Sequence, residues 1–254
     1  MRILLSPAKK MRRDTDSLPV RDLPGFLDRT EQILSYLRSQ TAEQLQTLWG
    51  CNDAIAAQNL ERLAQMDLRS GLTPAVLSYD GIAFQHMAPA VFTDSALAYV
   101  QDHLRILSGF YGVLRPMDGV TPYRLEMQAK APVEGHKDLY DFWGSLLYEN
   151  CRDGSGIFLN LASKEYSKAV KPFLQPGDTW IDCTFCELVK GKLTQKATFA
   201  KMARGEMVRY LAENGIVDPR DMAGFRSLDY RLREDLSTDA EYVFEHMVSG
   251  SSET

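Results

Sequence analysis

Arg2-Ile3-Leu4-Leu5-Ser6-Pro7-Ala8-Lys9-Lys10 is the stretch that decides the fold. Its apolar run predicts a short buried strand over residues 2–5, and Pro7 ends regular pairing because proline has no backbone N–H to donate. Polar side chains at the end of such a strand often form binding sites, so Ser6 and Lys9 are candidate site residues. The run Ile157-Phe158-Leu159-Asn160-Leu161 predicts a second buried strand, and Ser163 begins a short helix after it.

The remaining pattern mixes helices and strands and predicts one α/β domain. We expect helices over residues 24–38, 53–66, 94–107, 138–150, 163–170 and 198–213, and one that begins at the capping box Thr41-x-x-Gln44. Strands are expected over 75–79, 179–189 and 241–247, with extended segments over 111–116 and 122–127. The chain shows no internal repeat and no linker. It therefore predicts a single compact domain over residues 1–248, a mixed sheet surrounded by helices, followed by a frayed tail over 249–254.

Composition excludes several classes of protein. With 254 residues, 44% of them hydrophobic and 25% charged, the chain has the makeup of a globular protein that buries a real core. No apolar run approaches the roughly 20 residues that would cross a bilayer, and the three apolar residues at 3–5 fall short of a signal peptide. We expect a cytoplasmic protein that does not enter a membrane.

The cysteines and histidines predict neither a disulfide framework nor a metal site. Four cysteines at irregular spacings are expected to be thiols in a reducing compartment. Cys183-x-x-Cys186 could be a redox or zinc pair, but no second pair accompanies it, and the four histidines are scattered singly. Because the Gly-rich and His-rich motifs of common cofactor and metal sites are also absent, we expect no cofactor and no metal.

Charge is unevenly distributed along the chain. The net charge is −5, yet nine basic and five acidic residues lie between Asn160 and Arg209. Such a split allows one basic face to attract phosphates while the rest of the surface stays acidic.

Two predicted helices carry the basic residues. Lys164, Lys168 and Lys171 recur at helical spacing and form a stripe that contains no carboxylate. A bound anion would relieve the repulsion between these lysines, whereas the plainer alternative is a solvated face. In the helix over 198–213, Phe199, Met202 and Met207 mark the inner side.

The opposite side of that helix carries Lys201, Gly205 and Arg209, with Arg204 beside them. Glycine costs about 1 kcal/mol in a helix interior, so Gly205 predicts a close approach, either by a phosphate backbone or by another helix.

The stretch Leu45-x-x-Leu48-x-Gly50-Cys51-Asn52-x-x-x-Ala56 has the outline of a helix-hairpin-helix. Asn52 replaces the second glycine of that turn, and asparagine is the residue after glycine that best tolerates a left-handed conformation. The turn would offer backbone N–H groups of Gly50 and Asn52 to phosphates of duplex DNA without reading bases. An ordinary αα-hairpin is the alternative.

A second group of polar residues is suited to chemistry. Lys9, Arg115, Arg124, Glu126 and Asn160 combine cations, a carboxylate and an amide, which a surface that only coats DNA does not need. Lys9 would then be a nucleophile or a phosphate clamp, and Glu126 an acid or base. A structural ion pair between Arg124 and Glu126 on one face of a strand is the alternative.

Six ordered motifs resemble the bacterial YaaA family of peroxide stress proteins. They are Ser6–Lys9, Leu107–Asp118, Pro122–Met127, Asp138–Gly144, Asn160–Tyr166 and Ala203–Met207. The resemblance implies the α/β fold of that family, known as the cantaloupe fold, with a helix-hairpin-helix-like element. It also implies a cytosolic protein that limits iron-driven damage by hydrogen peroxide, and a basic cleft for double-stranded DNA. The cleft would be lined by Lys9, Arg115, Arg124, Glu126, Asn160, Ser163, Lys164 and Arg204.

Two functions therefore stand as hypotheses. The first is a stress protein, expected to be a monomer, that binds double-stranded DNA without reading its sequence. The residues expected to bind phosphate are Ser6, Lys9, Gly50, Asn52, Arg115, Arg124, Asn160, Ser163, Lys164, Lys168, Lys171, Lys201, Arg204 and Arg209. The second is an enzyme that acts on a nucleobase, a nucleotide or damaged nucleic acid, with Lys9 and Glu126 as catalytic residues and a small anion as ligand.

Overall fold

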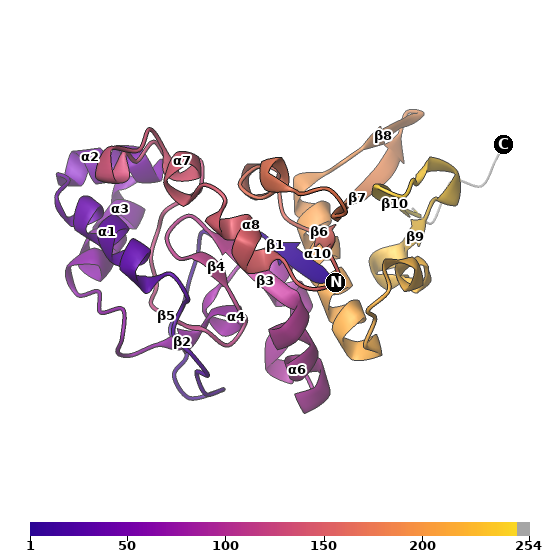
Figure 1. Cartoon of the computed structure of the whole chain (residues 1–254), viewed down its shortest axis with the longest axis horizontal. Coiled ribbons are helices and arrows are strands. Elements are labelled where there is room, and N and C mark those ends of the chain that lie inside the picture. The colour runs from indigo at the N-terminus through magenta and orange to yellow at the C-terminus, as the bar shows by residue number, and fades with distance from the viewer. Residues whose placement is uncertain (248–254) are drawn as a thin grey trace.

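An eight-stranded mixed sheet runs through the computed structural model, which describes residues 1–247 (Figure 1). The strand order is β4-β3-β1-β6-β7-β10-β9, and β8 pairs with the far end of β7. The strands are β1 (Arg2–Leu5), β3 (Leu104–Ser108), β4 (Gly112–Leu114), β6 (Ile157–Asn160), β7 (Thr179–Val189), β8 (Lys192–Thr194), β9 (Tyr230–Leu232) and β10 (Glu241–His246). A separate pair is formed by β2 (Thr73–Pro74) and β5 (Gly119–Val120).

The middle of the sheet is parallel and buried. β1 lies between β3 and β6, so that Leu4 is opposite both Arg105 and Asn160. β6, β7 and β10 continue in the same direction, whereas β4, β8 and β9 run antiparallel to their neighbours. The uninterrupted apolar runs of β1 and β6 are typical of parallel strands covered on both faces. The buried strands predicted over residues 2–5 and 157–161 are therefore confirmed.

The order of the strands reverses between β1 and β6. From β1 the chain moves outward to β3 and β4, and it then returns to the other side of β1 to form β6, β7 and β10. In open α/β sheets, ligands bind outside the carboxyl ends of the strands at such a reversal. The residues that follow Leu5 and Asn160 therefore occupy the favoured position for a site.

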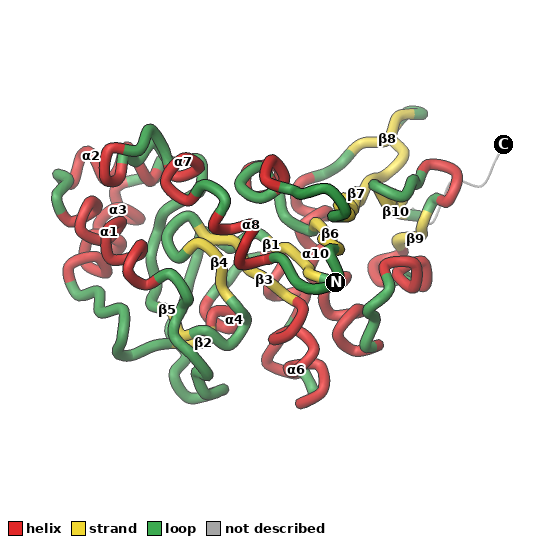
Figure 2. The backbone as a smooth tube through the Cα atoms, viewed as in Figure 1, coloured by secondary structure: helices red, strands yellow, loops and turns green. Residues whose placement is uncertain are grey.

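Helices lie around the sheet, and long loops connect them in the amino-terminal half (Figure 2). They are α1 (Leu27–Arg38), α2 (Ala42–Trp49), α3 (Asp53–Ala64), α4 (Ala75–Ser78), α5 (Ile82–Met87), α6 (Asp94–His103), α7 (Leu139–Trp143), α8 (Leu146–Cys151), α9 (Lys164–Ser167) and α10 (Ala197–Asn214). Short 3₁₀ turns include Lys171–Phe173 and Pro219–Gly224. One continuous apolar core joins sheet and helices, as a single α/β domain requires.

Gly205 lets α10 pack closely on α5. A Cβ atom built at Gly205 would overlap the carbonyl oxygen of Ala83, which lies in α5. Of the two alternatives left by the sequence, the approach of another helix is therefore the one observed. Phe199 differs from its prediction, because its side chain is exposed at the start of α10 and stacks on His246.

Three other element predictions were wrong. Residues 75–78 form α4 rather than a strand, and the helix that starts at Asp94 ends at His103. Residues Leu104–Ser108 form β3 instead, because a short apolar run fits a helix or a strand and pairing with β1 and β4 favours the strand. The helix expected over 138–150 is divided at Gly144, whose φ is 51°. The extended segment expected over 122–127 belongs to no helix or strand.

The expected tail over 249–254 lies outside the described residues. Among residues 1–247, no helix combines the length and the apolar character needed to cross a membrane.

Candidate functional site

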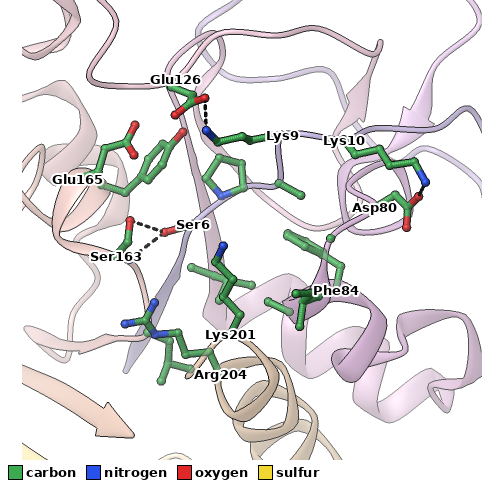
Figure 3. A pocket seen from close by; sticks show the side chains of 18 of the residues that line it. Ser6, Lys9, Lys10, Asp80, Phe84, Glu126, Ser163, Glu165, Lys201 and Arg204 are labelled. Carbon is green, nitrogen blue, oxygen red and sulfur yellow. Dashed lines mark hydrogen bonds and ion pairs between the residues drawn. The ribbon is translucent and has the colours of Figure 1, made fainter. Parts of the chain in front are cut away.

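A cavity of about 380 Å³ opens at the carboxyl ends of β1 and β6, where the strand order reverses (Figure 3). We call it the switch-point cavity. The loop after β1, the start of α5, the segment 123–126, the residues around Ser163 and one side of α10 surround it. Its polar and charged lining consists of Ser6, Lys9, Lys10, Asp80, Tyr123, Arg124, Glu126, Ser163, Glu165, Tyr166, Lys201 and Arg204.

Ser6 and Ser163 join the ends of the two central strands. The backbone N–H of Ser163 donates to Ser6 Oγ at 2.8 Å, and the Ser6 hydroxyl donates to Ser163 Oγ at 3.2 Å. Ser163 occupies the position before α9 as predicted, but its hydroxyl makes no hydrogen bond to that helix. Both hydroxyls therefore lie together at the cavity wall.

Two lysines at the rim are neutralised by carboxylates. Lys9 Nζ lies 2.6 Å from Glu126 Oε1, and Lys10 Nζ lies 2.6 Å from Asp80 Oδ2. The Lys9 side chain is 64% exposed, whereas a lysine nucleophile needs burial to keep its amine neutral.

The path of residues 122–127 separates Arg124 from Glu126. The Arg124 guanidinium faces the carbonyl oxygen of Trp49 at 3.4 Å from both Nε and Nη2, while Glu126 pairs with Lys9. The ion pair considered for Arg124 and Glu126 is not formed in the described chain.

Two cations that α10 contributes to the cavity have no acidic partner. Lys201 and Arg204 reach from α10 toward the Ser6–Ser163 pair (Figure 3), and within residues 1–247 no carboxylate lies within 4.0 Å of either one. Arg204 Nε is buried and finds no hydrogen-bond partner in the part of the chain that the structure describes. Burial lowers the pKa of Arg204. Because a buried N–H donor without a partner is costly, an anion bound to this guanidinium is its natural complement.

A second cavity of about 550 Å³ adjoins the first and shares Arg204 with it. We call it the lysine cavity, because Lys164, Lys168 and Lys171 line it. Lys168 Nζ lies 4.8 Å from the centroid of the Tyr140 ring, which favours a cation. α9 ends at Ser167, so the three lysines gather around a cavity rather than along one helix face.

Asp182 organises the lysine cavity, and sequence reasoning missed it. It accepts hydrogen bonds from Asn160 Nδ2 at 2.7 Å, Trp180 Nε1 at 2.9 Å and Lys171 Nζ at 2.9 Å. Burial raises the pKa of Asp182, but these three donors outweigh it and hold the pKa below 3.8. A carboxylate inside a predicted buried strand was the signal that could have found it.

A third cavity of about 820 Å³ shares Lys9 and Glu126 with the switch-point cavity. One wall is α2 with Gly50, the residue that ends this helix in the left-handed region with φ 54°. Asn52 has φ −75°, and its Oδ1 accepts from the backbone N–H of Ile55 at 3.0 Å. The expectation that Asn52 is left-handed was wrong, because the residue caps α3 instead. The structure shows an αα-hairpin here.

Arg115 and Arg209 lie apart from these cavities. β4 runs antiparallel to β3, so Arg115 emerges at the amino-terminal edge of the parallel strands, opposite Ser6. There it contacts Asp118 at 3.1 Å and Asp22 at 3.0 Å. Arg209 pairs with Glu213 one turn along α10 at 2.8 Å. Neither arginine lines a cavity described here.

Cys183 and Cys186 are buried free thiols. Burial raises the pKa of both, so neither has the thiolate character that redox chemistry needs. Among residues 1–247, no three histidine, cysteine or acidic side chains gather in a way that could hold a metal ion.

The three cavities share lining residues. Arg204 lines both the lysine cavity and the switch-point cavity, and Lys9 and Glu126 line both the latter and the cavity beside Gly50. We refer to the three cavities together as the basic groove. It brings together most of the residues that the sequence predicted as phosphate ligands.

Comparison with known proteins gives a consistent result. The family described as peroxide stress protein YaaA matches residues 1–236. A UPF0246 protein of Agathobacter rectalis is 55% identical over 249 residues, which cover 98% of this chain and 100% of the relative. UPF0246 proteins of Limosilactobacillus reuteri and Lachnoclostridium phytofermentans are 52% and 50% identical, each covering 96% of this chain and 99% and 96% of the relative. The chain thus belongs to the peroxide stress protein YaaA family, and its role lies in the response to oxidative stress.

Proposed function

We propose that the protein binds double-stranded DNA in the basic groove, through the phosphate backbone and without reading bases. One observation carries the proposal: Lys164, Lys168, Lys201 and Arg204 line two adjoining cavities, and no carboxylate of residues 1–247 lies within 4.0 Å of any of them. In a protein of net charge −5, such a concentration of unpaired cations favours a polyanion. Contacts to phosphate fix position but carry no sequence information.

Displacement of cations connects this binding to peroxide defence. Each lysine or arginine that neutralises a phosphate releases a condensed counterion, and ferrous iron is among the cations that DNA attracts. Iron released from DNA would generate radicals at a distance from the bases. The proposal thus includes a role in limiting iron-driven damage and a cytoplasmic location beside the chromosome.

A salt series tests the duplex proposal. Affinity for closed circular DNA, which has no ends, is measured from low to moderate salt for the wild type and for Lys164→Gln/Lys168→Gln. The logarithmic slope should become shallower by about 0.9 for each lost phosphate contact, so by about 1.8 for the double variant.

Lys190→Gln/Lys192→Gln is the matched control. It removes the same charge from the β7–β8 hairpin, where neither lysine lines a cavity described here. Equal slopes for both double variants would show that net charge alone determines binding, and the groove proposal would then be wrong.

The enzymatic alternative has weaker support. A Schiff base at Lys9 requires a neutral amine, yet Lys9 is exposed and pairs with Glu126. Borohydride trapping with damaged DNA checks this alternative, and a covalent adduct at Lys9 would revive it.

A further inference from the structure

We propose that the switch-point cavity binds a phosphomonoester carried by a nucleoside, with the phosphate between Lys201 and Arg204 and the base against the apolar wall beside Phe84. The inference goes beyond duplex binding, since it rests on this cavity alone. The ligand is either a free nucleoside monophosphate or the phosphorylated end of a DNA strand, which present the same group.

Two sides of the cavity differ in their charge pairing. Lys9 and Lys10, which follow β1, each have a carboxylate at 2.6 Å, so they need no anion. Lys201 and Arg204 on α10 have no such partner within residues 1–247, and Arg204 Nε is both buried and unpaired there. The anion is therefore expected on the side of the cavity that α10 forms.

The net charge of the lining matches a phosphomonoester. Five lysines and arginines and three carboxylates line the cavity, which leaves a net charge of +2. A phosphomonoester carries a charge of about −1.5 to −2 at pH 7 and would balance it. The guanidinium of Arg204 can bind two phosphate oxygens at once, and Lys201 adds a point charge. Ser6 and Ser163 bring hydroxyls to the same wall.

The remaining lining suits a base. Pro7, Ala8, Ile82, Phe84 and Leu125 give the cavity a largely apolar wall beside its charged interior. Its volume of about 380 Å³ lies at the lower end of the range for small-molecule sites and is far too small for a duplex. A single nucleotide, with its charged phosphate and its flat base, matches the size of the cavity and its division into a charged and an apolar part.

Gly81 allows the two segments that form this wall to lie close together. A Cβ at Gly81 would lie 2.6 Å from Ala8 Cβ, closer than real Cβ contacts. The loop after β1 and the start of α5 can therefore approach each other only because residue 81 has no side chain. This contact brings the apolar wall and the α10 cations to one cavity.

Calorimetric titration with deoxyadenosine 5′-monophosphate tests the inference. We expect this nucleotide to bind at least about tenfold more tightly than deoxyadenosine, because only the nucleotide offers a dianion to Lys201 and Arg204. Lys201→Met should abolish most of that difference, and since Lys201 is exposed, the variant is expected to fold. Arg204→Met should have the same effect.

Arg209→Met is the matched control, since it lies on the same helix outside the cavity and should leave nucleotide affinity unchanged. Equal affinity for nucleotide and nucleoside, or equal effects of Lys201→Met and Arg209→Met, would overturn the inference. Duplexes with 5′-phosphate and 5′-hydroxyl ends distinguish the source. A gain from the 5′-phosphate identifies a DNA end, and a gain seen only with the free nucleotide identifies a small molecule. Binding of closed circular DNA is measured separately and involves no phosphomonoester, so a negative result here leaves the duplex proposal intact.

Discussion

Gly205 shows how one missing side chain sets the position of the site. Because α10 lies directly on the backbone of α5 at this residue, Lys201 and Arg204 are held against the switch-point cavity. The sequence predicted a close approach at Gly205 but could not identify the partner, since α5 is distant in the chain.

Gly205→Ala is expected to destabilise the fold. The new Cβ would overlap the carbonyl oxygen of Ala83, and backbone cannot move aside as a flexible side chain can. We expect the free energy of unfolding to fall by about 2 kcal/mol or more, despite the better helix propensity of alanine. Urea unfolding measures the change. Gly154→Ala is the control, because its Cβ would meet nothing within 4 Å, and a similar loss in both variants would contradict the explanation.

Asp118 predicts a pH dependence of stability. Its carboxylate is 2% exposed and accepts from the backbone N–H and Nε of Arg115. Burial raises its pKa from 3.8 to about 6. Between these values the folded state holds a proton that the unfolded state has lost, so stability should fall as pH rises through this window and then level off.

Asp118→Asn should remove that component of the pH dependence, because asparagine does not titrate. Urea unfolding of wild type and variant, measured at about every pH unit from 4 to 7, gives the difference in their free energies of unfolding. Asp239→Asn, at an exposed carboxylate, is the control. A wild-type curve that rises through the window relative to Asp118→Asn would have the wrong sign.

At the scale of elements, the α2–α3 hairpin depends on its caps. Asn52 Oδ1 accepts from Ile55 N at the start of α3, and Thr41 forms the predicted capping box with Gln44 at the start of α2. We expect Asn52→Ala to lower the free energy of unfolding by about 1 kcal/mol.

Asn52→Asp should stay close to the wild type, since aspartate caps equally well and its charge favours a helix N-terminus. Thermal unfolding compares the two variants. Equal losses would show that the amide serves something other than capping.

Strand direction explains much of what the sequence could and could not predict. The sequence patterns of β1, β6 and β7 were clear enough for these strands to be predicted. Ser6 and Asn160, at the carboxyl ends of β1 and β6, were predicted as site residues. β3 was missed because its five residues follow α6 directly, and their sequence is compatible with a continued helix as well as with a strand. β4 lies within the extended segment expected over 111–116, but its antiparallel pairing with β3 was not foreseen, and this pairing takes Arg115 to the opposite edge.

The Lys9–Glu126 pair illustrates a second limit. Both residues were recognised as candidates, but their contact depends on the path of a segment without regular structure, and the sequence offered Arg124 as an equally good partner for Glu126. Local patterns predict strand ends well, while loops that cross a cavity follow from tertiary packing.

At the scale of the whole molecule, the acidic surface and the basic groove have opposite effects on association. A net charge of −5 would repel DNA at long range, while the groove that we propose as its binding site would attract it at close range. We expect the duplex association rate constant to fall by about tenfold or more between about 50 mM and 200 mM salt, because screening weakens the attraction. Stopped-flow mixing measures it. Urea unfolding at both salt concentrations controls for stability, and a rate that rises with salt would mean that repulsion dominates.

The position of β1 also constrains the order of events during synthesis. Leu4 leaves the ribosome well before its two neighbours in the sheet, Arg105 and Asn160. The centre of the sheet therefore cannot close until Asn160 has emerged, and β1 stays unpaired until both partners are available. Such long-range pairing makes folding slow, on the order of milliseconds to seconds. The nascent chain would meanwhile present an apolar strand that chaperones recognise.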